Sequence, residues 1–268
     1  MKVGVGIVTY NRPDYLKQCI AGVKKNLLDV ADVILLYNDG SNKGFKEYQS
    51  IYKTLPEKIV YKHAKKNKGV ATAKNWLLKK MYDAGCDYMF ILEDDIVIDS
   101  PKAVTEYIKK SDESGIEHFQ FVHHGDANKR KKVMTTKGVD LYRNPVGAWC
   151  LYTKKVLEVV GLFDPVYMNA WEHVEHSWLI ANAGYTPPWG ASVCDLSNSK
   201  KYMHEIPGSI DNSSIRPRKD FLANSINGLI RWKQKYPRQF PLEHILSGLL
   251  KEEAREYDKL GIKNPRYE

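Results

Sequence analysis

The amino-acid sequence predicts an α/β protein whose mixed, mainly parallel sheet is flanked by helices, with a helical extension at the C-terminal end. Two observations support this fold class. Over the first hundred residues, apolar runs of strand length alternate with longer segments of helical periodicity, and turn residues separate them. Strands joined in this way pair in parallel through right-handed crossovers. The 268 residues, 43% of them hydrophobic, suffice for one large folded domain and exclude intrinsic disorder.

Strands and helices alternate in the expected elements of the first hundred residues. The strands cover residues 3–9, 33–37, 58–61 and 87–92. The helices cover residues 13–28, 45–55 and 69–84. Pro13 suits the first turn of a helix, because its missing N–H would have no helical partner there.

From residue 101 onward the alternation is less regular. Further helices are expected over residues 103–111, 154–160 and 172–183, and further strands over residues 117–123 and 145–152. Residues 190–218 are rich in Ser, Asn, Gly and Pro, which indicates long functional loops. Residues 221–259 are expected to form two helices, broken at Pro237 and Pro241.

Composition narrows the class of protein. The chain has 41 Lys and Arg against 32 Asp and Glu, a net charge of +9, which fits either a polyanionic partner or a solvated basic surface. Apolar runs such as residues 88–92 are far shorter than the roughly 20 residues of a membrane span, so no span is expected. The first ten residues lack the order of a signal peptide, and the four cysteines form no CxxC pair. We therefore expect a cytoplasmic protein with free, buried thiols.

Three acidic residues, Glu93, Asp94 and Asp95, directly follow the apolar strand 88–92. Ligands of parallel α/β sheets collect at the carboxyl ends of strands. Three adjacent carboxylates would repel one another there unless a cation compensates them. Carboxylates together with diphosphate oxygens suit Mg²⁺ or Mn²⁺. The pattern therefore favours a divalent metal site over a solvated acidic turn.

Two more turns are expected near the same edge of the sheet. Asn38–Ser41 ends the second strand, and the carboxylate of Asp39 could accept an N–H from a nucleobase. Asn67–Gly69 leads into a helix with Lys74 and Asn75, and a helix N-terminus beside lysines suits phosphate groups. Each turn alone is a weak signal, because such turns are common and lysine-rich helix faces are usually solvated.

In their order along the chain, these segments resemble the inverting family 2 glycosyltransferases, which have the Rossmann-like GT-A fold. The segments are Val8–Arg12, Asn38–Ser41, Asn67–Gly69 with Lys74–Asn75, and Glu93–Asp95. The resemblance is close over residues 3–100 and looser to about residue 205. It implies a nucleotide-sugar-binding half over residues 1–100 and an acceptor and catalytic half over residues 101–205. Residues 206–268 would add a basic loop and the C-terminal helices.

The resemblance implies donor-binding roles for several residues. Thr9, Tyr10 and Arg12 match the segment that lines the base and ribose of the nucleotide. Asp39 matches the acid that binds the uracil edge, which implies a UDP-sugar donor. Lys74 stands where the family commonly has an arginine near the diphosphate.

The metal and sugar sites are implied in the same way. Asp95 matches the last acid of the family's metal motif and is the expected main ligand of Mn²⁺ or Mg²⁺. Glu93 replaces the usual first aspartate, and both Glu93 and Asp94 are expected to contact the donor. His204 lies where GT-A enzymes often bring a third metal ligand. Trp149 follows small residues that resemble the strand under the donor sugar, so it is expected to border that sugar.

The segment Trp171–Trp178 supplies the candidate catalytic residues. His173 stands at the position of the family's general base, and imidazole can take the proton of an attacking hydroxyl at neutral pH. Glu172 is the competing base. On a helix their side chains point about 100° apart, so the two cannot be equivalent. Trp171 and Trp178 are expected to flank a sugar-stacking cleft.

Two basic segments lie outside the donor motifs and bear on the acceptor. Residues 129–132 are consecutive cations, and residues 199–239 hold nine Lys and Arg against three acids. Within the second segment, Arg231–Lys233 interleaves cations with an aromatic ring, as single-strand binders often do. One hypothesis is therefore a nucleic-acid acceptor, a hydroxymethylated base in DNA, as in viral enzymes that act in a host cytoplasm. A glycan or protein acceptor is the alternative.

Residues and resemblance together predict a metal-dependent glycosyltransferase that moves a sugar from a UDP-sugar to an acceptor hydroxyl with inversion. A nucleotidyltransferase is a rival, but it would usually show a glycine-rich basic loop where this chain has Tyr10–Pro13. A non-catalytic nucleic-acid-binding module would explain the charge, but it would not need Glu93–Asp95 at a strand end.

Overall fold

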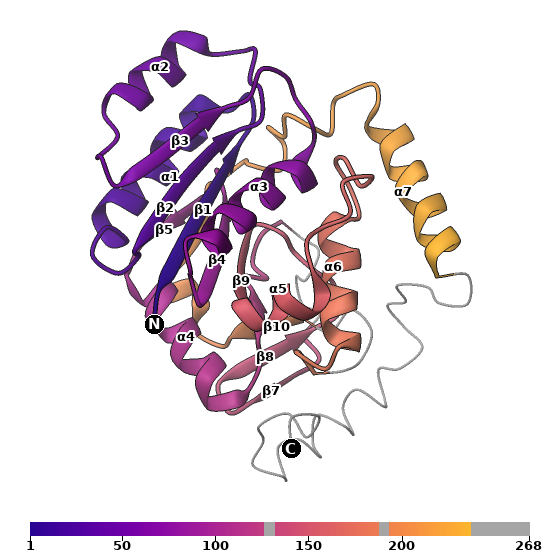
Figure 1. Ribbon diagram of the computed structural model, residues 1–268. Helices are drawn as coiled ribbons and strands as arrows, with labels where there is room; N and C mark the ends of the chain where they lie inside the picture. The colour runs from indigo at the N-terminus through magenta and orange to yellow at the C-terminus, as the bar shows by residue number, and fades with distance from the viewer. Residues whose placement is uncertain (126–131, 188–192, 237–268) are drawn as a thin grey trace.

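The computed structural model describes residues 1–125, 132–187 and 193–236, with a six-stranded sheet at the centre (Figure 1). The strand order is β3-β2-β1-β4-β9-β6. The bounds are β1 Val3–Thr9, β2 Val33–Asn38, β3 Ile59–His63, β4 Tyr88–Glu93, β6 His118–Gln120 and β9 Trp149–Thr153. Strands β1 to β4 pair in parallel, whereas β9 runs antiparallel between β4 and β6. The predicted mixed, mainly parallel sheet is confirmed.

Helices cover both faces of this sheet (Figure 1). One core contains side chains of α1 (Pro13–Asn26), α2 (Phe45–Lys53) and α4 (Lys102–Ser114). The other contains side chains of α3 (Val70–Asp83), α5 (Lys154–Val160) and α6 (Glu172–Asn182). Side chains alternate along a strand, so Phe90 and Leu92 of β4 enter the first core while Met89 and Ile91 enter the second.

Smaller elements complete the described chain. A three-stranded sheet has the order β10-β8-β7, with bounds β7 Met134–Thr136, β8 Val139–Tyr142 and β10 Val193–Leu196. A 3-10 helix, Ser199–Lys201, leads to β11 (Met203–Glu205), which pairs antiparallel with β5 (Ile96–Ile98). This pairing brings the segment after β10 beside the acids that follow β4. The last described helix is α7 (Phe221–Lys235).

The structure differs from the sequence expectations mainly in the second half. The strand expected from residue 145 begins at Trp149, because side chains bind the preceding residues: Gln120 Oε1 accepts from Val146 N, and Lys74 Nζ donates to Gly147 O. The short strands β5, β7 and β8 were not expected, since three or four residues carry too little periodicity. The second C-terminal helix and the cations at 129–131 lie outside the described residues.

The register of the strands brings the candidate residues to one edge of the sheet. Thr9 pairs with Asn38, and Val8 pairs with Glu93, so β1, β2 and β4 end nearly level. Gln120 of β6 pairs with Cys150 of the antiparallel β9, so the residues just before β9 reach the same edge. Side chains that follow these strand ends therefore lie close together.

All four cysteines are buried and free, as expected. None of the helices in the described part of the chain is long and apolar enough to cross a membrane.

Candidate active site at the carboxyl edge of the sheet

The acids after β4 belong to a network of charged side chains. Asp94 and Asp95 are almost fully buried. Arg12 donates from Nη1 to Asp95 Oδ2 at 2.9 Å and from Nη2 to Asp94 Oδ1. Thr9 donates from Oγ1 to Asp94 Oδ2 at 2.6 Å. Thr9 and Arg12, which were expected to line the nucleotide, therefore bind the acids directly.

His124 approaches the same acids from the segment after β6. Its Nε2 lies 3.3 Å from Asp95 Oδ2 and 3.6 Å from Glu205 Oε1. Burial alone would raise the pKa of Asp95, but His124 and Arg12 outweigh it and lower this pKa below its usual value. Burial raises the pKa of Asp94, in spite of Arg12. Asp95 is therefore the more strongly ionised acid of the pair.

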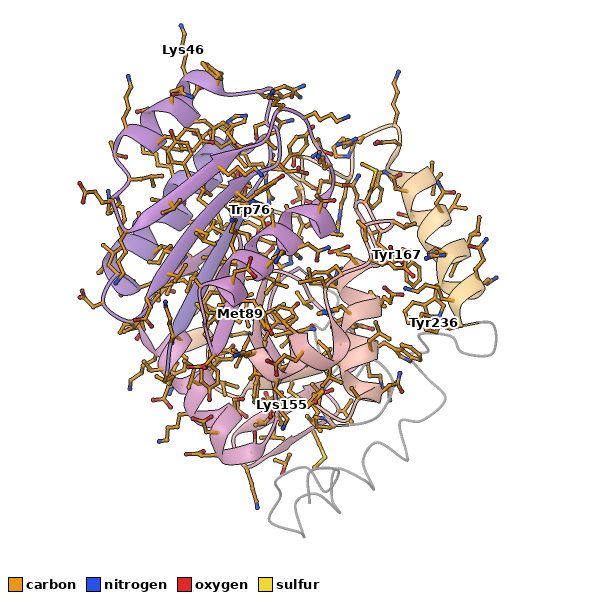
Figure 2. The ribbon with its side chains drawn as sticks, in the orientation of Figure 1. Lys46, Trp76, Met89, Lys155, Tyr167 and Tyr236 are labelled. Carbon is orange, nitrogen blue, oxygen red and sulfur yellow. The ribbon has the colours of Figure 1, made fainter. Side chains whose placement is uncertain are left out.

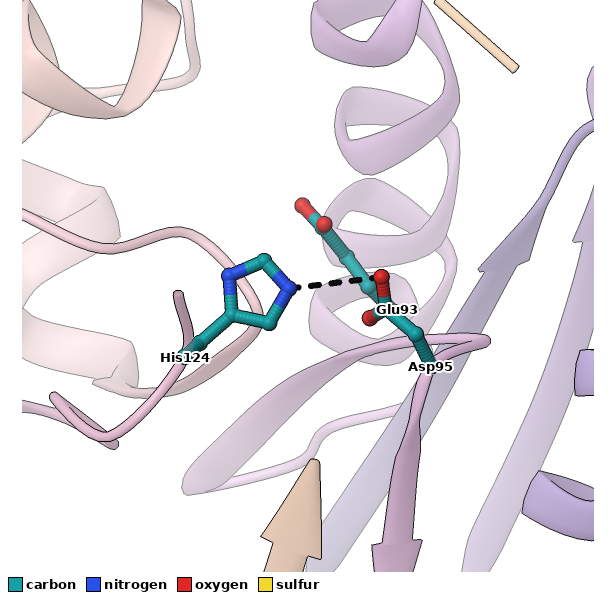
Figure 3. Close-up of side chains that lie close together, drawn as sticks. All are labelled: Glu93, Asp95 and His124. Atoms are coloured by element: carbon teal, nitrogen blue, oxygen red, sulfur yellow. Dashed lines mark hydrogen bonds and ion pairs between the residues drawn. The ribbon is translucent and has the colours of Figure 1, made fainter. Parts of the chain in front are cut away.

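Glu93, Asp95 and His124 form a set that fits a divalent cation (Figure 3). One ligand atom from each residue lies within 4.8 Å of the others. Oδ1 of Asp95 is buried and has no hydrogen-bond partner among the described residues, so it can take a ligand. Two carboxylates and an imidazole suit Mn²⁺, and the carboxylates alone suit Mg²⁺.

His204, the expected third metal ligand, does not reach this set. Glu205 faces the network, because its Oε2 accepts from Gly125 N and its Oε1 lies near His124. Side chains alternate along β11, so the neighbouring His204 points the other way. Its Nδ1 lies 2.6 Å from Asp99 Oδ2, and 53% of its side chain is exposed. The imidazole beside Asp95 is that of His124 instead.

Asp39 lies at the end of β2, but its carboxylate binds a neighbouring turn. Oδ1 accepts from Lys68 N at 3.0 Å, and Oδ2 accepts from Gly69 N at 2.9 Å and from Asn67 Nδ2 at 2.8 Å. Burial raises the pKa of Asp39 to about 6, against the lowering effect of the two backbone bonds. Asp39 therefore orders the turn before α3, a task that the sequence did not indicate.

The N-terminus of α3 is not open for phosphate in the way the sequence suggested. Val70 N donates to Met168 O at 2.8 Å, and Gly69 N donates to Asp39. The backbone N–H groups of Gly69 and Val70, which were expected to bind phosphate, therefore donate to oxygens of the chain itself.

Lys74 is also placed differently from its implied position near a diphosphate. Its side chain is 1% exposed, and Nζ lies 2.7 Å from Glu93 Oε1 and 3.6 Å from Glu172 Oε1. Burial alone would lower the pKa of Lys74, but the two carboxylates raise it above its usual value. Lys74 is therefore a buried cation between two acids.

Glu172 and His173 form a pair and are not simply two competing bases. Nδ1 of His173 lies 2.9 Å from Glu172 Oε1. Burial would raise the pKa of Glu172, but His173 and Lys74 outweigh it and lower this pKa to about 2. An ionised carboxylate only accepts hydrogen bonds, so Nδ1 carries the imidazole proton. In a neutral ring with this hydrogen bond, Nε2 has the lone pair that can take a proton.

Two neighbouring cavities open at this edge. The larger, of about 270 Å³, is lined by Glu93, His124, Gly147, Glu172 and His173, and by Ile210, Ile215 and Arg216 from the loop before α7. The smaller, of about 50 Å³, is lined by Tyr10, Arg12, Asp39, Asn67, Asp94 and Ser214, among others. Glu93 and Asn169 border both. Two members of the metal set, Glu93 and His124, therefore line the same cavity as the Glu172–His173 pair.

Trp149 does not border this cavity, which corrects the sequence expectation. The side chain is fully buried in the first core and stacks on Phe90 with ring centroids 4.8 Å apart. Gly147, two residues earlier, lines the cavity instead. The strand begins at Trp149, so the alternation that follows turns this ring into the core.

Trp171 and Trp178 do not flank a sugar-stacking cleft, because both pack against α7. Trp171 donates from Nε1 to Ser225 O at 3.0 Å, and a Cβ at Gly228 would lie 2.5 Å from its ring. Trp178 makes an edge contact with Trp232 at a centroid distance of 5.3 Å. These contacts join the helical extension to the N-terminal end of α6.

Acids pair with two cations of α7, Arg231 and Lys235. Trp232 is fully buried. Arg231 and Lys235 lie within 3.3 Å and 3.1 Å of Asp164 Oδ2, and Lys235 also pairs with Glu175. Tyr167 and Tyr236 lie near the same acids, between α6 and α7 (Figure 2). This part of the basic segment therefore holds α7 in place.

The sequence did not single out His124, Gly147 or Arg216. His124 follows an expected strand, so the rule that locates sites at carboxyl strand ends could have found it. Gly147 is one of the small residues before Trp149, and the sequence indicated no role of its own for it. Arg216 was one cation among many in a loop, and nothing local in the sequence separates it from the others.

The model of glycosyl transferase family 2 matches residues 4–155, more than half of the chain. The chain therefore belongs to glycosyl transferase family 2, and it is a glycosyltransferase. The family match and the fold set aside the two rival classes, a nucleotidyltransferase and a non-catalytic binding module.

Particular relatives agree with this class. The uncharacterized glycosyltransferase R363 of Acanthamoeba polyphaga mimivirus is 22% identical over 255 residues, which are 90% of this chain and 93% of the relative. TarS of S. aureus, solved with UDP-GlcNAc, is 15% identical, with a TM-score of 0.52 over 84% of this chain and 64% of that one. This chain spans only 38% of a longer TarS chain.

A mannosyltransferase of Pyrobaculum calidifontis, solved with GDP-Man and Mn²⁺, has a TM-score of 0.54 and 14% identity. The match covers 96% of this chain and 80% of that one. At such identities the solved structures show the shared GT-A fold alone.

Replacing Glu172 by Gln is expected to lower the free energy of unfolding by about 3 kcal/mol at pH 7, because a pKa lowered from 4.5 to about 2 stabilises the folded state. This contribution is present above pH 4.5 and is lost as the pH falls towards 2. The difference between variant and wild type should therefore narrow below pH 4.5 in urea unfolding measured from pH 3 to 7. Glu158→Gln, at an exposed position, is the control. A difference independent of pH would contradict the assignment.

Proposed function

We propose that the protein transfers a sugar from a UDP-sugar to an acceptor hydroxyl with inversion, with a divalent metal as cofactor. One observation carries this proposal: Glu93 and His124 of the metal set line the same cavity as His173, whose imidazole is oriented by Glu172. An inverting transfer needs both functions, charge compensation at the leaving group and deprotonation of the acceptor, on the two sides of one sugar.

Asp95, Glu93 and His124 would hold the metal. Mn²⁺ is the better match to a set that includes imidazole, and a solved relative of this fold contains it. When bound, the ion compensates the charge that builds on the departing diphosphate. Arg12 holds Asp94 and Asp95 in position from the other side.

The nucleotide would lie along the smaller cavity. Tyr10 borders it, and the Asp39–Asn67 pair presents polar groups to a base. Asp39 at the family position for the uracil-binding acid supports UDP. TarS, which has the same fold, was solved with the uridine nucleotide sugar UDP-GlcNAc. The mannosyltransferase was solved with the guanosine nucleotide sugar GDP-Man, so the fold alone does not fix the base.

His173 would act as the base through Nε2, with Glu172 as its orienting residue. Glu172 accepts from Nδ1–H and so keeps the lone pair of Nε2 toward the cavity. As the acceptor oxygen attacks the anomeric carbon, its proton passes to Nε2. The resulting imidazolium is stabilised by the buried carboxylate.

For the acceptor, we propose a hydroxymethylated base in DNA as the first candidate. Arg216 lines the cavity with His173, its guanidinium forms no hydrogen bond or ion pair with the described residues, and the exposed Lys219 lies on the same loop. A viral relative is consistent with this acceptor. Arg231 and Lys235 of α7 are paired with acids, so they do not support a DNA acceptor. The support comes from the cations of the loop before α7.

The four free thiols support a reducing, cytoplasmic location.

Asp95→Asn is expected to abolish UDP release and to weaken Mn²⁺ binding by at least about 100-fold, since it removes an ionised ligand. Mn²⁺ binding is measured by electron paramagnetic resonance without donor. His204→Ala is the matched control and should bind Mn²⁺ like wild type, because this imidazole pairs with Asp99. Loss of binding in His204→Ala with binding kept in Asp95→Asn would reverse the ligand assignment.

His173→Gln is expected to reduce transfer to the acceptor by about 100- to 10,000-fold, because it removes the imidazole lone pair that takes the hydroxyl proton. Binding of the UDP-sugar, measured by calorimetry, should remain as in wild type, since His173 lies on the acceptor side. Full transfer activity in this variant would show that another residue is the base.

A labelled-sugar assay tests the acceptor with hydroxymethylated DNA, unmodified DNA, glycans and peptides. Transfer is expected to hydroxymethylated DNA alone, to fall with rising salt as phosphate contacts are screened, and to weaken in Arg216→Ala. Transfer to a glycan or peptide, with neither transfer to DNA nor salt-dependent DNA binding, would rule out the nucleic-acid acceptor.

A further inference from the structure

Lys74 occupies an unusual position for a lysine. It lies on α3 with 1% of its surface exposed, although its ammonium is charged. A buried ammonium is retained only where partners compensate its desolvation. Two carboxylates do so here: Glu93 Oε1 at 2.7 Å and Glu172 Oε1 at 3.6 Å. The backbone oxygen of Gly147 accepts a further bond at 3.1 Å.

The two acids belong to different parts of the site. Glu93 is a member of the candidate metal set and ends β4. Glu172 begins α6 and bonds the imidazole of His173. Lys74 is thus a direct electrostatic link between the side of the cavity that faces the leaving group and the side that faces the acceptor.

Gly147 lies at the junction of these groups. A Cβ at this residue would lie 2.8 Å from Lys74 Nζ, 3.3 Å from Glu93 Oε1 and 3.4 Å from His173 Cγ. Only a residue without a side chain lets the ammonium, the carboxylate and the imidazole ring converge around one backbone position. The close packing leaves Lys74 no route to a diphosphate without leaving both acids.

We propose that Lys74 is a positioning residue that fixes the Glu172 carboxylate between ammonium and imidazole, and thereby sets which nitrogen of His173 can accept the acceptor's proton. This inference rests on the proposed role of His173 as base. It assigns to Lys74 a task on the acceptor side of the cavity, in contrast to the diphosphate contact that its position in the sequence implied.

The link works through the charge of Glu172. With Lys74 in place, Glu172 is held as an acceptor, so Nδ1 carries the proton and Nε2 accepts. Without the ammonium, the buried carboxylate of Glu172 loses the cation that lies 3.6 Å from its Oε1, which favours uptake of a proton by Glu172. A protonated Glu172 can donate to Nδ1, which moves the ring proton to Nε2 and removes the lone pair needed for catalysis.

The decisive measurement is the tautomer of His173, observed by nitrogen-15 NMR of protein labelled in its histidine rings. Wild type should show Nδ1–H. Lys74→Met should shift the His173 signals towards the Nε2–H form and lower transfer by at least about 100-fold. Lys79→Met, at an exposed position of the same helix, is the control and should match wild type in both readouts.

Lys74→Gln serves as the second variant in case Lys74→Met does not fold. Its amide can still donate to Gly147 O but carries no charge, so it should show the same tautomer shift. Unchanged Nδ1–H signals with wild-type transfer in a folded Lys74 variant would overturn the proposal. So would a loss of transfer without any change of tautomer, because that result indicates a merely structural role.

A double-variant cycle with Glu172→Gln tests whether Lys74 acts through Glu172. If it does, adding Lys74→Met to Glu172→Gln should reduce transfer little further; losses that multiply would contradict it. The tautomer measurement needs no turnover. Wild-type protein that moved no sugar would therefore refute the proposed function while the NMR result still decided the role of Lys74.

Discussion

The structure around the site depends on the compensation of closely spaced carboxylates. Level strand ends bring Glu93–Asp95 to one edge of the sheet, and α6 adds Glu172. Several carboxylates in a partly buried site repel one another unless cations lie beside them. The basic groups come from three separate segments: Arg12 after β1, Lys74 on α3 and His124 after β6. Each ion pair therefore also fixes the element that carries its cation.

This arrangement explains how the two halves of the chain make one site. The first half provides the sheet edge and most of the charges, and the second half provides the Glu172–His173 pair and the loop that carries Arg216. Neither half closes the cavity alone. Asp39 contributes in a different way, because its three hydrogen bonds order the turn that leads into α3 and so hold the start of the helix that carries Lys74.

The sequence was sufficient where local patterns determine the structure. Strand and helix periods predicted the sheet, and the rule for strand ends located Glu93–Asp95. It was insufficient where a side chain's direction depends on distant packing. Trp149 was misplaced because the start of β9 depends on bonds from Gln120 and Lys74. Trp171 was misplaced because its partner is α7. The imidazole ligand of the metal was expected at His204 and not at His124, since a three-residue strand is too short to show which side chains face the site.

The packing of Trp171 against α7 also bears on the order in which parts of the site form during synthesis. Trp171 has a left-handed backbone conformation, with φ of 74°, that is uncommon for a residue with a side chain. Its bond to Ser225 O, 54 positions later, helps to hold it. Glu172 and His173 follow directly, so during synthesis the acidic edge of the sheet can form well before Ser225, which helps to hold the start of α6, has left the ribosome. The helix start that carries the proposed base would thus be secured after the acidic edge of the sheet.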